Sequence, residues 1–200
     1  MAVFLPAREG YGEHEDRGSR FLAWVFHCPD EAAFDARMEA LRLEHPKARH
    51  HCWAWKVGTG FRFSDDGEPG GTAGRPMAQV LEGAEVEEVA AICVRYFGGV
   101  KLGTGGLARA YSGATARAAQ DAGRQEVIPF TEFHLRLPFA QLGLRTELEA
   151  LFDGISFTGD FGAEAWEGMV RLESSQWPRC RALLDERSAG QTLWSDVTES

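Results

Sequence analysis

The sequence predicts an α+β protein made of two domains in tandem, residues 1–128 and residues 129–200. Short apolar runs with a period of two alternate with segments whose apolar residues recur every three or four positions, which indicates strands interleaved with helices. With 200 residues, of which 44% are hydrophobic and 26% charged, the chain has enough apolar material for one large core or two small ones. The Ile128-Pro129 pair is the best candidate for the domain boundary.

The first predicted elements of the amino-terminal domain are a strand, a helix and a second strand. Residues 20–28 form an apolar, aromatic run that predicts a strand. A helix is expected after Pro29, because Asp30 complements the positive end of the helix dipole and apolar residues recur on one face until Pro46. Residues 51–57 alternate again and predict the second strand.

The rest of this domain is predicted to be a loop, a short helix, a buried strand and a long helix. Residues 61–75 are rich in glycine, aspartate and proline and predict a loop, which a short helix over residues 77–81 follows. Residues 86–97 contain a continuous apolar stretch, which is typical of a central strand buried on both faces. A glycine-rich loop over residues 98–106 then leads into a helix over residues 107–122 built largely from small side chains.

The carboxy-terminal domain is predicted to follow the order β-α-β-β-α-β, which is the split β-α-β pattern of a ferredoxin-like sandwich. A turn at Gly159-Asp160 joins the middle strands, Ser175 caps the second helix, and Gly190 marks its carboxy-terminal end. The predicted segments, in chain order, are the strand 134–137, the helical stripe 144–151, the strands 155–158 and 166–172, the helix after Ser175, and the strand 193–197.

Charge and cysteine content exclude some classes of protein. Thirty acids against 21 bases leave a formal net charge of -9, so nucleic-acid binding would require a local basic patch. The longest central apolar run is too short for a bilayer, and the first residues lack the core of a signal peptide. Four widely separated cysteines suit free thiols in a reducing compartment. We therefore expect a cytoplasmic protein with no membrane partner.

No motif for a common enzyme class or cofactor occurs in the chain. The sequence contains no Walker A loop, dinucleotide fingerprint, G-x-S-x-G or H-E-x-x-H. We therefore predict no cofactor, no metal and no catalytic residue, and leave open whether the protein is an enzyme.

One segment stands out against the acidic background. Residues 89–120 contain no acid and six glycines. A locally positive, glycine-rich strand, loop and helix of this kind indicates an anion-binding site. The four bases of the segment are Arg95, Lys101, Arg109 and Arg117.

The glycine-rich loop gives this site a predicted geometry. Glycines allow a ligand to approach backbone amides closely, and Thr104 as the N-cap would leave the amides of Gly105 and Gly106 pointing outward. Lys101 in the loop and Arg109 in the first turns of the helix would then hold a phosphate or a nucleic-acid backbone. The alternative is a tight crossover in which the glycines only let helix and sheet pack closely, and the spacing leaves both interpretations open.

Two further clusters have both a functional and a structural interpretation. Asp65, Asp66 and Glu68 could hold Mg²⁺ or act as an acid–base pair, but an acidic turn in which Asp65 caps the backbone is favoured. Arg75, just downstream, could neutralise these acids rather than bind a ligand.

The histidines and cysteines of the first domain raise the question of zinc or nucleophilic chemistry. His27-Cys28 and His50-His51-Cys52 could supply four zinc ligands if their two strands paired side by side. Adjacent strand residues point to opposite faces, so each cluster offers about one ligand per face, and zinc is not predicted. A Cys–His nucleophilic pair is conceivable at the second cluster, but structural histidine is favoured.

Two long motifs, residues 64–76 (SDDGEPGGTAGRP) and residues 95–112 (RYFGGVKLGTGGLARAYS), resemble the IMPACT/YigZ family. Weaker similarity extends over residues 19–21 and 48–55, and the second domain resembles that of the bacterial two-domain members through residues 138–151. The resemblance implies that the first domain has the fold shared by a ribosomal small-subunit protein and domain IV of elongation factor G. It implies that the second domain is like domain V of that factor.

The sequence departs from the family pattern at a few positions. The family usually has Ser where Gly70 stands, and commonly Thr and Asn where Arg49 and His51 flank His50. Loss of a hydroxyl at position 70 could loosen a hydrogen bond, whereas Arg49 and His51 would add positive charge beside the predicted patch.

The resemblance implies a role in translation, because eukaryotic relatives regulate translation under amino-acid starvation by competing for the ribosome-associated activator of an initiation-factor kinase. The leading hypothesis is a cytosolic accessory protein that binds RNA or the ribosome through the glycine-rich basic loop. The alternatives are a protein–protein regulator of a stress response without RNA binding, and an enzyme acting on a phosphorylated small molecule. The candidate residues for RNA or phosphate binding are His50, Arg75, Arg95, Lys101, Gly103, Thr104, Gly105, Gly106 and Arg109.

Overall fold

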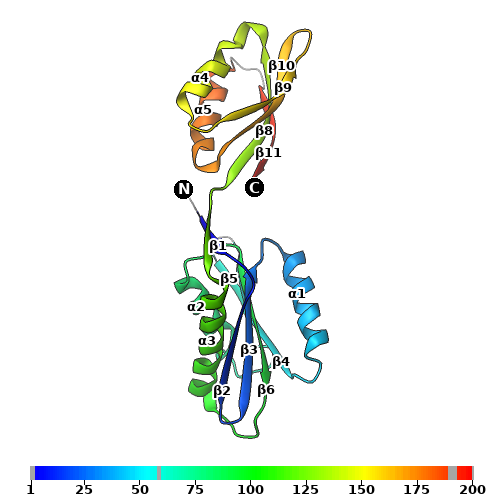
Figure 1. The fold of residues 1–200 in the computed structure, drawn as a ribbon, viewed down its shortest axis with the longest axis vertical. Coiled ribbons are helices and arrows are strands. Elements are labelled where there is room, and N and C mark those ends of the chain that lie inside the picture. Colours follow the sequence, from blue (N-terminus) through cyan, green and yellow to red (C-terminus); the bar gives the residue numbers. More distant parts are fainter. Residues whose placement is uncertain (1–2, 58–59, 189–192, 200) are drawn as a thin grey trace. The chain divides into compact units, whose positions relative to one another are not determined.

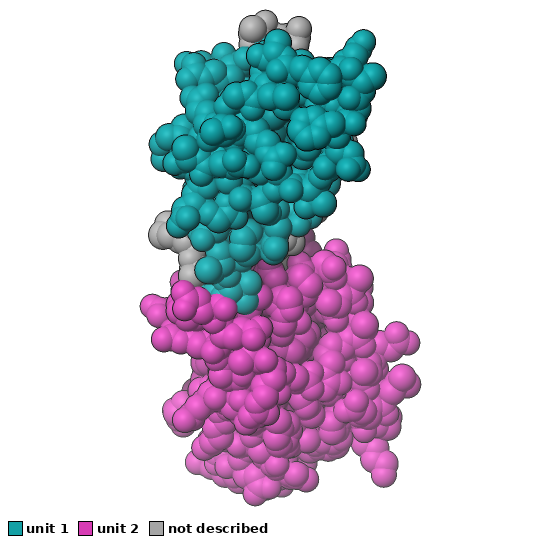
Figure 2. Space-filling model, turned by 45° about the horizontal axis from the view of Figure 1, so that its top comes forward, with its two compact units in different colours: residues 1–3, 127–200 teal, residues 4–126 magenta. Residues whose placement is uncertain are grey.

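A computed structural model describes residues 3–57, 60–188 and 193–199. The chain forms two compact units, which are coloured separately in Figure 2: residues 4–126, called here the N-terminal unit, and residues 127–200 with residues 1–3, the C-terminal unit. Both units contain helices and antiparallel sheets, so the predicted α+β class is confirmed. The predicted boundary at residue 129 remains a prediction for proteolysis.

The N-terminal unit is built on a five-stranded antiparallel sheet of order β2-β3-β6-β4-β5 (Figure 1). A separate two-stranded sheet joins β1 to β7. The strands are β1 (Val3–Pro6), β2 (Gly10–Asp16), β3 (Ser19–His27), β4 (His50–Val57), β5 (Gly60–Ser64), β6 (Val89–Tyr96) and β7 (Arg124–Val127), and the helices are α1 (Glu31–Glu44), α2 (Gly74–Gly83) and α3 (Gly103–Ala122).

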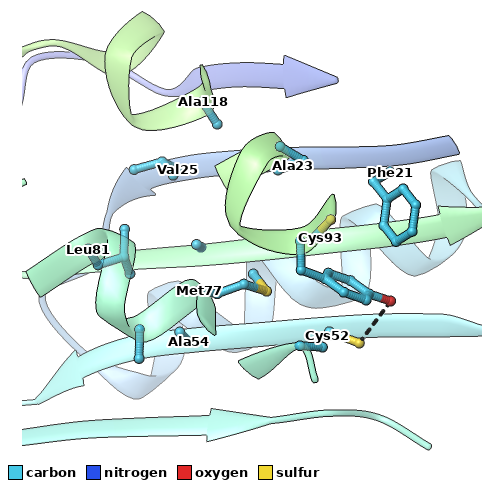
Figure 3. Close-up of a cluster of buried hydrophobic side chains, with 14 of the residues drawn as sticks. Phe21, Ala23, Val25, Cys52, Ala54, Met77, Leu81, Cys93 and Ala118 are labelled. Carbon is cyan, nitrogen blue, oxygen red and sulfur yellow. Dashed lines mark hydrogen bonds between the residues drawn. The ribbon is translucent and has the colours of Figure 1, made fainter. Parts of the chain in front are cut away.

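Strand β6 is the centre of this sheet, as its continuous apolar run predicts. Its residues are buried from Val89 to Arg95, because helices cover both faces of the sheet. Figure 1 shows α2 and α3 on one side and α1 on the other. Alternate β6 side chains enter two separate cores: Cys93 packs with α2 and α3 (Figure 3), and Ile92 packs with α1.

The small residues of α3 allow it to lie directly on β2. A Cβ atom added at Gly12 would overlap the α3 backbone at Ala114 and Ala118, so a larger residue would force the helix away from the strand. Gly12 and the small residues of α3 therefore serve close packing of helix on sheet. An added Cβ at Gly99 or Gly103 of the predicted glycine-rich loop would meet nothing within 4 Å, so close packing does not explain these two glycines.

Helix α1 forms for the reasons that its sequence indicates. The carboxylate of Asp30 accepts a hydrogen bond of 2.8 Å from the backbone N–H of Ala33, which is N-cap geometry. The predicted apolar stripe of Phe34, Met38 and Leu41 is buried against the sheet.

Several elements differ from the prediction. The predicted loop over residues 61–75 contains the edge strand β5, and β1, β2 and β7 were not predicted at all. Helix α3 begins at Gly103 instead of Leu107, so the last four residues of the predicted glycine loop belong to the helix.

The C-terminal unit confirms the predicted β-α-β-β-α-β order. Its four strands form an antiparallel sheet of order β11-β8-β10-β9, and both helices pack against one face of it (Figure 1). Short 3-10 helices over Phe139–Gln141 and Ser174–Gln176 precede the two α-helices. The elements are β8 (Phe130–Pro138), α4 (Gly143–Leu151), β9 (Ser156–Phe161), β10 (Ala165–Glu173), α5 (Trp177–Arg187) and β11 (Trp194–Glu199).

Three local predictions for this unit are corrected or fall outside the description. Ser175 is not the cap of α5, which has Gln176 at that position and no side-chain cap. Gly159-Asp160 lies within β9, and the hairpin turns after Phe161. The predicted C-terminal glycine, Gly190, lies outside the described residues.

Candidate RNA- or phosphate-binding groove

A groove of about 810 Å³ opens on the N-terminal unit where three segments meet. These segments are the end of β6 with the start of α3, the residues between α1 and β4, and the acidic loop before α2. We call it the basic groove. Its lining residues are Lys47, Arg49, His50, Glu68, Pro69, Arg95, Tyr96, Phe97, Lys101, Leu102, Gly103, Thr104 and Leu107.

Three exposed cations give the basic groove its charge. Lys47, Arg49 and Lys101 take part in none of the ion pairs formed by the residues that the structure describes. His50 is half-buried and its Nδ1 lies 2.7 Å from the carbonyl oxygen of Asp66. Because a carbonyl only accepts, Nδ1 carries the proton of this contact.

Behind these cations, Arg95 is part of a buried polar network. Its Nη1 donates to both carboxylate oxygens of Glu68, at 2.6 and 2.9 Å, and the two side chains are only 8% and 3% exposed. The hydroxyl of Tyr111 donates to Glu68 at 2.8 Å, and Cys52 Sγ lies 3.3 Å from that hydroxyl (dashed line in Figure 3). Arg95 therefore has its charge balanced by Glu68 inside the protein, and its role as a phosphate ligand stays a prediction.

The same network excludes Cys52 as a nucleophile. Burial raises the pKa of its thiol well above the ordinary value, as it also does for Cys93. Cys52 Sγ is 3.0 Å from the carbonyl oxygen of Asp65, which holds the thiol in its protonated form.

The acidic loop is fixed by its own carboxylates. Asp65 accepts backbone hydrogen bonds from Gly71, Ala73 and Gly74 at 2.7 to 2.9 Å, so it caps the start of α2 from a distance. Burial raises the pKa of Asp65, but these three bonds outweigh burial and the pKa lies below its ordinary value.

The other two acids of the loop are engaged as well. The carboxylate of Asp66 accepts from the backbone N–H of His51 at 2.6 Å, and Glu68 binds Arg95. Within the described part of the chain, no cluster of three His, Cys, Asp or Glu side chains could hold a metal ion. The acidic loop therefore supports the predicted structural turn, in which each carboxylate has a protein donor.

The structure brings together some of the predicted site residues and separates others. His50, Arg95, Lys101, Gly103 and Thr104 line the basic groove. The predicted site residues that do not line it are Arg75, Gly105, Gly106 and Arg109.

The residues whose backbone amides are free at the start of α3 differ from those predicted for the anion site. Leu102 is the N-cap and no side chain caps the helix, so Thr104 is not the cap. The unpaired N–H groups of a helix are its first four, which here run from Leu102 to Gly105, whereas Gly106 is buried against Leu102 inside the first turn. Gly103 has φ +71°, which favours glycine at this position.

Lys47, Tyr96 and Phe97 line the groove but were not among the predicted site residues. Tyr96 and Phe97 directly follow Arg95 in the motif over residues 95–112, which is a signal that the sequence offered. Lys47 reaches the groove only through tertiary contacts, because β4 pairs with β6 so that His50 lies opposite Arg95. The same pairing separates two residues that were expected to add charge together: Arg49 lines the groove, whereas His51 is buried.

The alternative of a zinc site required that the strands carrying the two His/Cys clusters, β3 and β4, lie side by side. These two strands are not neighbours in the sheet. Strand β6 lies between β3 and β4, so the His27 and His51 clusters belong to strands that do not pair. His27 Nε2 is 2.6 Å from Glu88, and burial raises the pKa of the Cys28 thiol to about 12. None of the described helices is long and apolar enough to cross a membrane.

Comparison with known proteins identifies relatives over most of the chain. A family model described as the Impact N-terminal domain matches residues 17–119. The IMPACT family member YigZ of Escherichia coli (strain K12) is 42% identical over 167 residues, which cover 80% of each chain. The protein IMPACT homolog of Saccharomyces cerevisiae is 31% identical over 94 residues, which cover 44% of this chain and 36% of that protein. A crystal structure described as that of a hypothetical protein is 35% identical with a TM-score of 0.67, covering 99% of this chain and 96% of the other.

Proposed function

Since the chain belongs to the IMPACT family, we propose that it is a translation-associated regulatory protein that binds RNA or the ribosome through the basic groove. The observation that carries this proposal is the presence of three exposed cations, Lys47, Arg49 and Lys101, on one groove of an acidic protein. The family resemblance supports the link to translation, because eukaryotic members regulate that process.

The geometry of the groove suits a nucleic-acid backbone. The uncapped start of α3 lies at the same groove, which Leu102, Gly103 and Thr104 line, and phosphate oxygens accept from both free amides and cations. Glu68 also lines the groove, but its charge is balanced by Arg95. The groove therefore presents net positive charge to a ligand.

Cations elsewhere on the protein are less suited to this role. On the sheet of the C-terminal unit, Arg136 pairs with Glu167 and Arg171 pairs with Glu132 across neighbouring strands. Residues 129–200 carry 6 bases and 12 acids, so this unit repels a polyanion. RNA binding is therefore assigned to the N-terminal unit.

The two alternative functions make different demands. An enzyme acting on a phosphorylated small molecule would need a free acid or base in the groove. The carboxylates of Asp65, Asp66 and Glu68 are all held by protein donors, which leaves the imidazole of His50 as the candidate base. A protein–protein regulator would bind its partner with little salt dependence, which a titration distinguishes from phosphate binding.

The test is a fluorescence-anisotropy titration with single-stranded RNA at several salt concentrations. Three phosphate contacts predict that log K falls with log salt with a slope of roughly -2, at about -0.7 per contact on single strands. The double substitution Lys47→Ala/Lys101→Ala removes two contacts and should bring the slope to about -0.7. Arg179→Ala is the matched control, because Arg179 is exposed on α5 of the C-terminal unit and does not line the groove.

Each outcome of this titration has a defined meaning. A flatter slope for the double variant with an unchanged slope for Arg179→Ala supports the proposal. Identical curves for the wild type and the double variant contradict the groove as the site. If the wild type does not bind even at low salt, the protein–protein regulator takes the place of the RNA-binding function.

A further inference from the structure

We propose that the basic groove selects single-stranded RNA by stacking one unpaired base on the ring of Phe97. This inference rests on the proposed function and specifies its ligand: a nucleotide whose base enters the groove while its phosphates contact the cations. It predicts discrimination between single-stranded and duplex RNA, which phosphate contacts alone would not provide.

Phe97 is an unusually exposed aromatic side chain in a defined place. Its ring is 56% exposed and lines the groove directly after β6. The Arg95 guanidinium lies 5.5 Å from the centre of this ring and 5.4 Å from that of Phe21, so it packs between two aromatic rings. Because Glu68 fixes Arg95, the ring of Phe97 is supported from within the protein. The ring is therefore available to a ligand without first having to become ordered.

The walls around Phe97 are apolar, which a site for phosphate alone does not require. Pro69, Leu102 and Leu107 line the same groove, together with the half-buried ring of Tyr96. A nucleobase has apolar faces and polar edges, so it fits a site that combines apolar walls with a few polar groups. At about 810 Å³, the groove is within the range of roughly 300–1,000 Å³ that is common for small-ligand sites.

The cations line the same groove as Phe97 and come from two different segments. Lys101 follows Phe97 by four residues in the same loop, and Lys47 and Arg49 come from the segment before β4. Aromatic rings that stack bases, combined with cations that follow the backbone, are the arrangement by which proteins bind single strands. A duplex keeps its base faces inside the stack and offers only phosphates and groove edges. The groove therefore favours single strands through Phe97.

The experiment compares Phe97→Leu with the wild type in an anisotropy titration. Leucine keeps the apolar volume and removes the aromatic face, and Phe97 is exposed enough for the variant to fold, which a thermal melt checks. The probes are a ten-residue oligouridylate, an abasic ribose-phosphate strand of the same length, and an RNA duplex of ten base pairs. Phe161→Leu is the matched control, since Phe161 is 65% exposed on β9 of the C-terminal unit.

We expect Phe97→Leu to weaken binding of oligouridylate about five-fold, because stacking on an aromatic ring contributes at least roughly 1 kcal/mol per base. The salt slope should not change, because no phosphate contact is lost. The variant should bind the abasic strand and the duplex as the wild type does, and Phe161→Leu should match the wild type on every probe.

The results also separate this inference from the proposed function. If Phe97→Leu binds oligouridylate as tightly as the wild type while Lys47→Ala/Lys101→Ala binds more weakly, base stacking is wrong and phosphate binding stands. An equal loss on the abasic strand also overturns stacking, since that strand has no base. If the wild type binds none of the probes at low salt, the RNA-binding function fails and this inference fails with it.

Discussion

Arg95 and Glu68 determine the shape of the groove from beneath its surface. Their ion pair connects β6 to the acidic loop, and Tyr111 of α3 adds a third attachment through its hydroxyl. Burying two charges is costly, and the pair persists because Glu68 accepts from both partners. The Nε of Arg95 has no hydrogen-bond partner among the described residues, so the fold keeps a donor unsatisfied at this position. The pair therefore joins β6 to the acidic loop where both line the groove.

We predict that Glu68→Gln lowers the free energy of unfolding by about 3–5 kcal/mol, because it leaves the Arg95 charge buried without a counter-ion. Urea unfolding followed by tryptophan fluorescence measures the change. Glu15→Gln is the control: Glu15 pairs with Arg20 but is 66% exposed, so its loss should cost less than about 1 kcal/mol. Equal effects of the two substitutions would show that the buried pair contributes no more than a surface pair.

His51 gives the N-terminal unit a dependence on pH. Burial lowers the pKa of His51, and this effect outweighs the nearby Asp66 carboxylate, which raises it. A depressed pKa means that the unfolded state binds the proton more tightly. The contribution of neutral His51 to the free energy of unfolding is therefore fully present above the pKa of the unfolded state, about 6.5. This contribution is lost as the pH falls toward the lower pKa of His51 in the folded state.

We predict that the free energy of unfolding of the wild type decreases between pH 7.5 and pH 5.5 more than that of His51→Leu. Other histidines titrate in both proteins, so the difference between the two pH profiles isolates His51. Urea unfolding at each pH measures both profiles, and hydrogen exchange over β4 localises the loss. Parallel profiles would mean that His51 stays neutral in both states or titrates alike in both.

At the scale of the elements, hydrophobic periodicity predicts the buried parts of the fold and misses its edges. The central strand β6 and the helix α1 follow from their apolar patterns, because burial determines both. Strand β2 does not, since its sequence GYGEHED is polar and contains two glycines. It becomes a strand by pairing with β3 and by the close approach of α3 at Gly12, which are tertiary effects.

The start of α3 shows how a small error in an element changes the predicted site. The last four residues of the predicted loop, from Gly103 to Gly106, belong to the helix although three of them are glycine. This shift moves the free amides toward Leu102 and places Arg109 outside the groove. Propensity alone favours the loop, and the packing of α3 on β2 and β3 decides otherwise.

At the scale of the whole molecule, the candidate site is assembled from three distant segments. The sequence identifies Lys101 and the start of α3 from the acid-free segment, because charge and glycine content are local properties. It cannot place Lys47 beside them, since that proximity depends on the order and register of the strands. The family motifs span two of the three segments, which explains why resemblance locates the site better than spacing does.

The division of the chain into two units gives the last prediction. Limited proteolysis with proteinase K should cut between about residues 123 and 133 and leave two resistant fragments. Strand β7 ends at Val127 and β8 begins at Phe130, so Ile128 and Pro129 form the connection, and Ile128 is 46% exposed. Each unit buries its own hydrophobic clusters, so both fragments should stay folded after the cut. Mass spectrometry of the fragments identifies the cut, and a resistant core that spans residues 123–133 would contradict two independently packed domains.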